Sequence, residues 1–306
     1  MSTPIHKMHY RDETNIFYVK RDDLLPFSFG GNKYRKALLY FEEILENDYD
    51  TVITVGSASS NHCRIIANLA KKHQLDCYII IPKENDKPAS NKTLMKILSA
   101  HILTPNKSDI KATINQLISN LKSDHKKPYY IKMGGHGVLG TQAYKEAFEE
   151  IFRDAHYPFD YIFLATGTGT TQAGLVVGQA LKNTQESIVG ISVLSSYEDG
   201  FKHVLESVVD YFKEKDVDLK IPIINLVDDY LAGGYGKSND AISEIIKTVF
   251  RSDGIALDPT YTGKSFLGML EYLKNNQIKH KKILFLHTGG APIFFDALES
   301  IEGSNK

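Results

Sequence analysis

Short apolar segments alternate with longer amphipathic segments along most of the chain. The short segments are rich in Val, Ile, Leu and aromatic residues, whereas the longer ones repeat apolar residues every three or four positions. The first pattern is typical of buried strands and the second of helices. We expect strands near residues 16–20, 51–56, 77–82, 101–105, 129–134, 161–167, 187–195, 224–227 and 283–289.

The amphipathic segments that separate these strands predict helices near residues 33–47, 61–72, 110–122, 140–152 and 240–250. Strands that are apolar throughout and alternate with helices are typical of parallel sheets covered on both faces. The sequence therefore predicts an α/β fold. Two polar stretches, residues 83–92 and 106–109, are interpreted as solvated loops. Ligands of such folds bind beyond the carboxyl ends of the strands, so the residues that follow each strand are the candidates for function.

The first candidate segment is residues 29–36, which contains Gly30, Gly31 and Lys33. The two glycines permit a positive φ and a close backbone approach before a helix that should begin at residue 32 or 33. The positive end of that helix and apolar surroundings would lower the pKa of Lys33, and Schiff-base chemistry requires a neutral amine. A lone motif of this kind more often covers a helix with solvated charge, so it needs support from other segments.

The second candidate segment begins another helix after the strand at 51–56. Ser60 and Asn61 are good helix caps, and the free N–H groups there could bind a carboxylate. An ordinary cap beside a partly exposed His62 explains these residues equally well. No metal is expected at His62, because no second ligand stands at the required spacing.

The third candidate segment, residues 165–178, places small and hydroxyl residues between a strand and a helix. Such a turn lets several backbone N–H groups converge on a phosphate. Gln172 stands where a dinucleotide fingerprint has its third glycine, and the Gly-Lys-Ser/Thr of a nucleotide P-loop is absent. We therefore expect a phosphate monoester rather than a dinucleotide, with a purely structural turn as the alternative. The residues of this loop are Gly167, Thr168, Gly169, Thr170 and Thr171.

Two later segments each carry one further candidate. Tyr261, in residues 258–270, could lie over an aromatic ring. Thr288 follows an apolar strand and would present its hydroxyl at the strand's carboxyl end. Either segment alone would also pass for a turn.

Composition excludes several classes of protein. The chain has 306 residues, of which 42% are hydrophobic and 24% charged, the balance of a globular protein with room for two domains. A net charge of −1 offers no basic surface for nucleic acid or for an anionic membrane. No apolar run reaches the roughly 20 residues of a transmembrane helix, and no signal-peptide core is visible. Cys63 and Cys77 are too few for a disulfide framework and are interpreted as buried filler, so we expect a cytoplasmic protein.

Taken in order, the candidate segments resemble the fold-type II pyridoxal 5'-phosphate (PLP) enzymes that include 1-aminocyclopropane-1-carboxylate deaminase and D-cysteine desulfhydrase. The resemblance runs from about residue 3 to residue 297. Each matching piece is short, but seven pieces in family order are not expected by chance. They are KRDD (20–23), GGNKYRK (30–36), SNH-x-R (60–64), GTGTTQAG (167–174), GYG (234–236), DPTYTGKS (258–265) and HTGGAP (287–292).

The resemblance implies a two-domain fold like that of the tryptophan synthase β-subunit, with largely parallel sheets covered by helices. A large PLP-binding domain would comprise residues 1–45 and 141–306, and a small α/β domain would comprise residues 46–140. Members of this family are typically homodimers.

The resemblance also implies roles for individual residues. Lys33 would carry the Schiff base and remove the α-proton, Asn61 would bond the phenolic oxygen, and the loop from Gly167 to Thr171 would hold the phosphate. Thr288 would meet the pyridine nitrogen, and Thr262 would also present a neutral group there. The substrate would contact Ser60, Asn61, His62, Tyr235 and Tyr261, of which Ser60 and Tyr261 would act with Lys33 in catalysis.

Two positions discriminate within the family. The deaminase branch has a glutamate after the tyrosine of its DP-x-Y motif, where this chain has Thr262, and the desulfhydrase branch has the threonine of HTGG, here Thr288. A neutral hydroxyl leaves the pyridine ring a weaker electron sink than a carboxylate does, which suffices when a good β-leaving group departs. We therefore expect β-elimination from a D-cysteine-like amino acid, giving pyruvate and ammonia. Ser59 departs from the glutamine that is usual in the family, so the substrate can differ from that of other members while the chemistry is shared.

Other reactions fit the same residues. They are ring-opening deamination of 1-aminocyclopropane-1-carboxylate, elimination from another β-substituted amino acid, and racemisation. A PLP-binding protein without turnover is the alternative of another class. The joint presence of Lys33, Ser60, Asn61 and Tyr261 argues against it, because binding alone needs mainly the phosphate loop.

Overall fold

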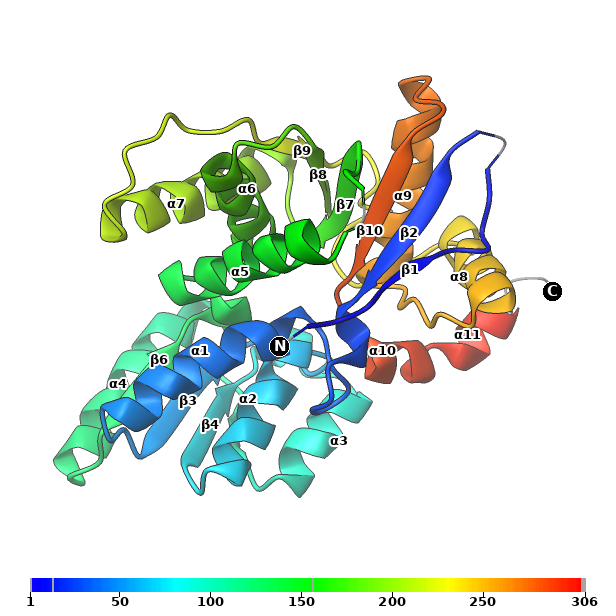
Figure 1. Ribbon diagram of the computed structural model, residues 1–306. Coiled ribbons are helices and arrows are strands. Elements are labelled where there is room, and N and C mark those ends of the chain that lie inside the picture. Colours follow the sequence, from blue (N-terminus) through cyan, green and yellow to red (C-terminus); the bar gives the residue numbers. More distant parts are fainter. Residues whose placement is uncertain (1, 13, 156, 304–306) are drawn as a thin grey trace. The chain divides into compact units, whose positions relative to one another are not determined.

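The computed structural model describes residues 2–12, 14–155 and 157–303. By their contacts the residues form two compact units, Met1–Asn32 with Thr141–Lys306, and Lys33–Gly140. Each unit contains a largely parallel sheet with helices beside it, which confirms the predicted α/β class (Figure 1).

The sheet of the first unit has the strand order β1-β2-β10-β7-β8-β9. Only the pair of β1 and β2 is antiparallel, and the other neighbours are parallel. The pattern of apolar residues did not predict β1, whose three residues are not buried. The strands are β1 (Ile5–Lys7), β2 (Ile16–Arg21), β7 (Tyr161–Thr166), β8 (Ser187–Ser192), β9 (Asn225–Val227) and β10 (Lys282–His287).

The helices of the first unit follow its strands along the chain. They are α5 (Val138–Asp154), whose first turn precedes the unit boundary, and α6 (Thr170–Lys182), α7 (Tyr197–Glu214), α8 (Asp240–Asp253), α9 (Thr262–Asn275), α10 (Ala291–Asp296) and α11 (Leu298–Gly303).

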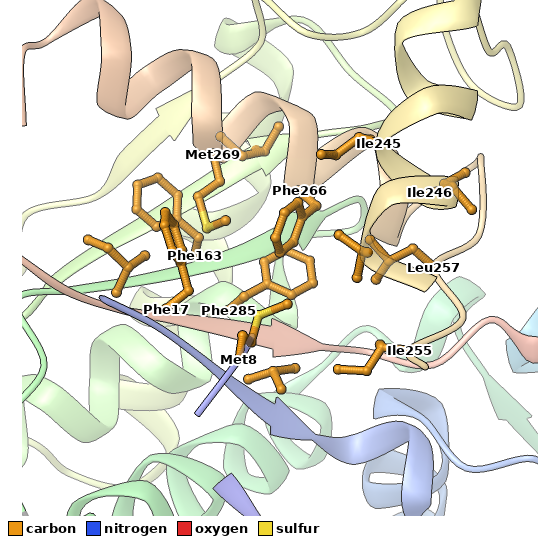
Figure 2. Close-up of a cluster of buried hydrophobic side chains, with 14 of the residues drawn as sticks. Met8, Phe17, Phe163, Ile245, Ile246, Ile255, Leu257, Phe266, Met269 and Phe285 are labelled. Carbon is orange, nitrogen blue, oxygen red and sulfur yellow. The ribbon is translucent and has the colours of Figure 1, made fainter. Parts of the chain in front are cut away.

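One face of this sheet packs against α8 and α9 (Figure 2). Phe17 of β2 and Phe285 of β10 are buried in this cluster with Phe266 of α9, whose ring centre lies 5.1 Å from that of Phe285. Alternate residues of a strand face opposite sides of the sheet. Leu284 and Leu286 are fully buried as well, so β10 is covered on both faces and reads as a continuous apolar run.

The second unit has the strand order β5-β4-β3-β6, all parallel. Helix α4 packs its apolar side against β3 and β4. The elements are α1 (Asn32–Glu46), β3 (Thr51–Val55), α2 (Asn61–Lys72), β4 (Asp76–Ile80), α3 (Ser90–Ile97), β5 (His101–Leu103), α4 (Ile110–Ser123) and β6 (Pro128–Ile131).

Helix α1 belongs to this second unit by its contacts. The hydroxyl of Tyr40 donates to the carbonyl oxygen of His136 at 3.0 Å, and the ring of Phe41 lies 5.9 Å from the ring of His73. The sequence expectation had instead grouped residues 33–45 with the larger domain. The difference arises because both partners of α1 are distant in sequence.

The interpretation of residues 83–92 as a solvated loop is wrong at its C-terminal end. Helix α3 begins at Ser90, and Asn91 is only 1% exposed. Within the described residues, no helix combines the length and hydrophobicity that crossing a membrane requires.

Candidate active site

Lys33 lies in the first turn of α1 and is partly buried. Its Nζ donates to the carbonyl oxygen of Gly134 at 3.2 Å, within the second unit. Burial lowers the pKa of Lys33 to about 8, although the nearby Cys63 thiol acts in the opposite direction. A substantial fraction of this amine is therefore neutral near pH 8, which is the state that attacks a carbonyl carbon.

Asn32, the residue before Lys33, is anchored to two segments of the first unit. Its N–H donates to the carbonyl oxygen of Thr288 at 3.0 Å, and its side-chain amide donates to the hydroxyl of Thr171 at 3.1 Å. Gly31 has a φ of 99°, and a Cβ there would lie 2.7 Å from the Thr288 carbonyl oxygen. Only glycine permits this approach. Asn32 therefore joins the predicted phosphate loop to the segment after β10.

The predicted phosphate loop connects β7 to α6. Gly169 has a φ of 85°, and a Cβ there would lie 2.9 Å from the backbone of His203 and Val204 in α7. At Gly167, by contrast, no atom of the described chain beyond the glycine and its two chain neighbours lies within 4 Å of the Cβ position. The loop is thus packed behind Gly169 and open at Gly167, beside the N-terminus of a helix, which suits an anion.

Gln172 explains why the dinucleotide fingerprint is incomplete here. Its amide donates to the carbonyl oxygen of Asn225 at 2.7 Å and accepts from the hydroxyl of Thr166 at 2.9 Å. A Cβ at Gly190 would come within 2.0 Å of its Oε1. The fully buried Gln172 therefore links α6 to β7, β8 and β9 and has a structural role.

Alanine substitutions at the two loop glycines should have different effects. Gly167→Ala should leave the unfolding temperature of the apoprotein unchanged but weaken PLP binding by ~10-fold or more, because the methyl group fills space that the phosphate needs. Gly169→Ala should lower apoprotein stability by about 1–2 kcal/mol through its left-handed backbone alone. Calorimetry without PLP and titration with PLP separate the two effects. Equal PLP affinity in Gly167→Ala and the parent would contradict the phosphate assignment.

The N-terminus of α2 has free donors in the second unit. The Ser60 hydroxyl oxygen accepts from the N–H of Cys63 at 3.2 Å, as an N-cap does. Among the described residues, no acceptor is bonded to the N–H groups of Asn61 and His62 or to the hydroxyl proton of Ser60. These three donors can receive a carboxylate, with the helix dipole in support.

The ring of His62 has a fixed tautomer. Its Nε2 lies 2.8 Å from the Thr54 hydroxyl, which itself donates to the carbonyl oxygen of Ile131 at 2.8 Å, so Nε2 carries the proton. Burial holds the pKa of His62 well below its usual value, and the Lys33 and Lys36 charges act in the same direction. Nδ1 is therefore an acceptor, buried without a partner within the described chain.

This tautomer narrows the expected role of His62. A neutral ring whose only proton is already donated to Thr54 cannot bind a carboxylate, so only the backbone N–H of His62 suits that purpose. Nor do the described residues include any group of three or more His, Cys, Asp or Glu side chains that could hold a metal ion.

The side-chain amide of Asn61 is oriented by its neighbours. Its Oδ1 accepts from Nδ2 of Asn91 at 3.0 Å and lies 3.5 Å from a guanidinium nitrogen of Arg64. No acceptor within the described part of the chain is bonded to its Nδ2. A donor therefore remains for a ligand oxygen, which fits the phenolic oxygen of PLP. Asn91 was not among the predicted site residues, although a Ser-Asn pair before the apolar Leu94 and Met95 is a helix-start signal.

Asp258 shapes the segment that carries Tyr261. Its buried carboxylate accepts from the N–H groups of Thr260, Tyr261 and Thr262 at 2.9, 2.8 and 3.1 Å. Burial raises the pKa of Asp258, and these hydrogen bonds only partly offset the effect. The Tyr261 hydroxyl lies 2.6 Å from that of Tyr235, so the structure brings these two predicted residues together.

Thr262 and Thr288 differ in whether their hydroxyls are available. The Thr262 hydroxyl donates to Asp258 Oδ2 at 2.8 Å and accepts from the Asp258 N–H at 2.7 Å, and the residue is fully buried. The expectation that Thr262 offers a neutral group to the pyridine nitrogen is therefore corrected, because this hydroxyl is committed to Asp258. The Thr288 hydroxyl has no hydrogen-bond partner in the described part of the chain, so of the two hydroxyls it is the one that remains available to a ligand.

Comparison with known proteins identifies the relatives of this chain. The sequence model of the family described as pyridoxal-phosphate dependent enzyme matches residues 2–289. The crystal structure of an ACC deaminase homologue is 31% identical, with 99% of this chain and 94% of that chain covered and a TM-score of 0.90.

Two more distant structures share the fold. A hydrogen sulfide-producing enzyme from Fusobacterium nucleatum is 22% identical, with 95% of this chain and 96% of that chain covered and a TM-score of 0.67. Threonine deaminase isoform 2 from Solanum lycopersicum is 18% identical, with 99% and 83% covered and a TM-score of 0.70.

Proposed function

Because the chain belongs to the family of pyridoxal-phosphate dependent enzymes, we propose that it is a lyase that eliminates the β-substituent of a small, D-cysteine-like amino acid. With D-cysteine and water, the products would be pyruvate, ammonia and hydrogen sulfide. The choice of reaction rests on the difference in hydrogen bonding between two threonines. The Thr262 hydroxyl is hydrogen-bonded to Asp258, so the neutral Thr288 hydroxyl is the group available to the pyridine nitrogen.

The donors and the amine that this site offers match the groups of PLP. The neutral amine of Lys33 would hold the aldehyde carbon, and the N–H groups of the loop from Gly167 to Thr171 would hold the phosphate. The free Nδ2 of Asn61 would donate to the phenolic oxygen, and Thr288 would bond the ring nitrogen. The anchoring of Asn32 to both Thr171 and Thr288 supports a common role for these segments.

Bound PLP supplies an electron sink that acidifies the α-carbon of the substrate. The N–H groups of Asn61 and His62, with the Ser60 hydroxyl, would hold the substrate carboxylate at the start of α2. Lys33 would remove the α-proton, since burial lowers the pKa of its amine to about 8. The paired hydroxyls of Tyr261 and Tyr235 would contact the substrate and limit the space at its β-carbon.

A neutral partner at the pyridine nitrogen favours elimination over ring opening. It does not hold a proton on that nitrogen as a carboxylate would, so the ring withdraws electrons less strongly. Loss of a thiolate needs little further stabilisation, whereas opening an unactivated cyclopropane needs more. Family resemblance also leads us to propose the D-enantiomer and a homodimer, and the two isolated cysteines lead us to propose a cytoplasmic location.

A comparison of two substrates tests this proposal. We expect sulfide and pyruvate from D-cysteine, and slow or absent 2-oxobutanoate from 1-aminocyclopropane-1-carboxylate, under identical conditions. L-cysteine and other β-substituted amino acids complete the panel, and Thr288→Ser, which retains the hydroxyl, serves as the matched control for Thr288→Val. Rapid 2-oxobutanoate formation without sulfide would refute the elimination. Absence of any turnover with bound PLP would instead favour a binding protein.

A further inference from the structure

Asn91 is a buried polar residue that the proposed function leaves unused. It lies in the first turn of α3 and is 1% exposed. Its Nδ2 donates to two acceptors, the carbonyl oxygen of Ser59 at 2.7 Å and Oδ1 of Asn61 at 3.0 Å. Both acceptors belong to the segment at the start of α2, so Asn91 connects α3 to that segment within one unit.

A packing role alone does not account for an asparagine at this position. Its Oδ1 is buried and has no hydrogen-bond partner within the described chain, which costs free energy that an apolar residue would not incur. The two bonds from Nδ2 compensate for this cost. The role of Asn91 must therefore lie in the hydrogen bonds that its side-chain amide donates to Ser59 and Asn61.

That donor decides which end of the Asn61 amide faces outward. The acceptor oxygen and the donor nitrogen of an amide diverge from one carbon within a single plane, so holding Oδ1 toward Asn91 directs Nδ2 the other way. Arg64, at 3.5 Å from the same Oδ1, acts in the same sense because a guanidinium can only donate. If the Asn61 amide were reversed, its NH₂ group would face the donor groups of Asn91 and Arg64.

We propose that Asn91 is a positioning residue that holds the Asn61 amide with its NH₂ group directed to the phenolic oxygen of the cofactor. The inference rests on the proposed function for the identity of that oxygen. The hydrogen bond from Asn91 itself is independent of it. The side-chain contact couples α3, which contributes no other residue to the candidate site, to cofactor binding.

Two substitutions distinguish positioning from packing. Asn91→Ala removes the donor and leaves a small cavity. Asn91→Asp keeps the shape but offers only acceptors, so the Asn61 amide should reverse and present its oxygen to the phenolic oxygen. A packing role predicts the larger effect for Asn91→Ala, whereas positioning predicts the larger loss of PLP affinity for Asn91→Asp. Asn115→Ala and Asn115→Asp, on the exposed side of α4, are the matched controls.

The first measurement is the PLP dissociation constant, obtained by titrating each apoprotein and following the visible absorption band. We expect ~10- to 100-fold weaker binding in the Asn91 variants and no change in the controls, the scale of one hydrogen bond to a charged group. In an Asn61→Ala background the Asn91 changes should add nothing further. Additive losses, or a greater loss for Asn91→Ala than for Asn91→Asp, would overturn the proposal.

The second measurement needs no cofactor. In apoprotein labelled with ¹⁵N-asparagine, the side-chain amide signal of Asn61, assigned through its loss in Asn61→Ala, should shift in Asn91→Ala and not in Asn115→Ala. An unshifted signal would overturn the inference. If Asn91→Ala does not fold, Asn91→Ser replaces it. A parent protein that takes up no PLP while the signal still shifts would refute the proposed function and leave the amide contact established.

Discussion

Replacing Lys33 with alanine should abolish covalent retention of PLP and lower turnover by a factor on the order of 10³ or more, because one side chain both holds the cofactor and moves the α-proton. The purified parent should be yellow and the variant colourless. Mass spectrometry after borohydride reduction should find the cofactor on Lys33 in the parent and on no lysine in the variant.

Lys36 provides the matched control for this prediction. It lies one turn further along α1, is 1% exposed, and burial holds its pKa well below the usual value. Lys36→Met should retain the visible band and the label on Lys33. A label on Lys36 in the parent would show that the wrong lysine of this motif was assigned.

Replacing Lys20 with methionine should reduce the free energy of unfolding by about 3–5 kcal/mol, the usual effect of breaking a buried ion pair from one side. Lys20 and Glu150 form such a pair, with side chains 0% and 4% exposed. Lys20 also donates to the carbonyl oxygen of Thr3 at 2.6 Å, and the Thr3 N–H donates to Glu150 at 2.8 Å. The substitution therefore removes the counter-charge from a buried carboxylate and loosens the N-terminal segment.

Urea unfolding of the apoprotein measures this effect. The double variant Lys20→Met/Glu150→Leu should recover much of the loss, because no buried charge is left. The exposed pair of Lys126 and Asp76, 3.0 Å apart, is the control, and Lys126→Met should change stability by about 0–1 kcal/mol. A loss in Lys20→Met no larger than in Lys126→Met would contradict the structural role.

The fold was predictable wherever a strand is buried on both faces. Strands β7 and β10 are continuous apolar runs, and such runs can be recognised without knowing their neighbours. Strand β1 could not be recognised, because its three residues are held by pairing with β2 rather than by burial. The start of helix α3 was predicted as a loop, because the burial of Asn91 depends on Ser59 and Asn61, which are distant in sequence.

The candidate site was predictable as a set of segments but not as a set of donors and acceptors. Lys33 and the Gly167–Thr171 loop stand out by residue type and position after a strand. The tautomer of His62, however, is set by Thr54 and the carbonyl oxygen of Ile131 on two strands. Likewise, the hydrogen bond from the Thr262 hydroxyl to Asp258 is known only from the structure. Hydrogen-bond direction is a tertiary property, which spacing along a chain does not encode.

The pairing of β2 with β10 has a consequence for synthesis on the ribosome. These strands pair in parallel from Ile16 with Lys282 to Arg21 with His287, so a central neighbour of β2 emerges from the ribosome long after β2 itself. The unit Lys33–Gly140 contains all its own strand partners and is complete much earlier. It should therefore fold co-translationally, while the edge of β2 that pairs with β10 remains unpaired. An unpaired apolar edge invites association with other nascent chains. The period between emergence of β2 and emergence of β10 is thus when a growing chain of this protein most needs a chaperone.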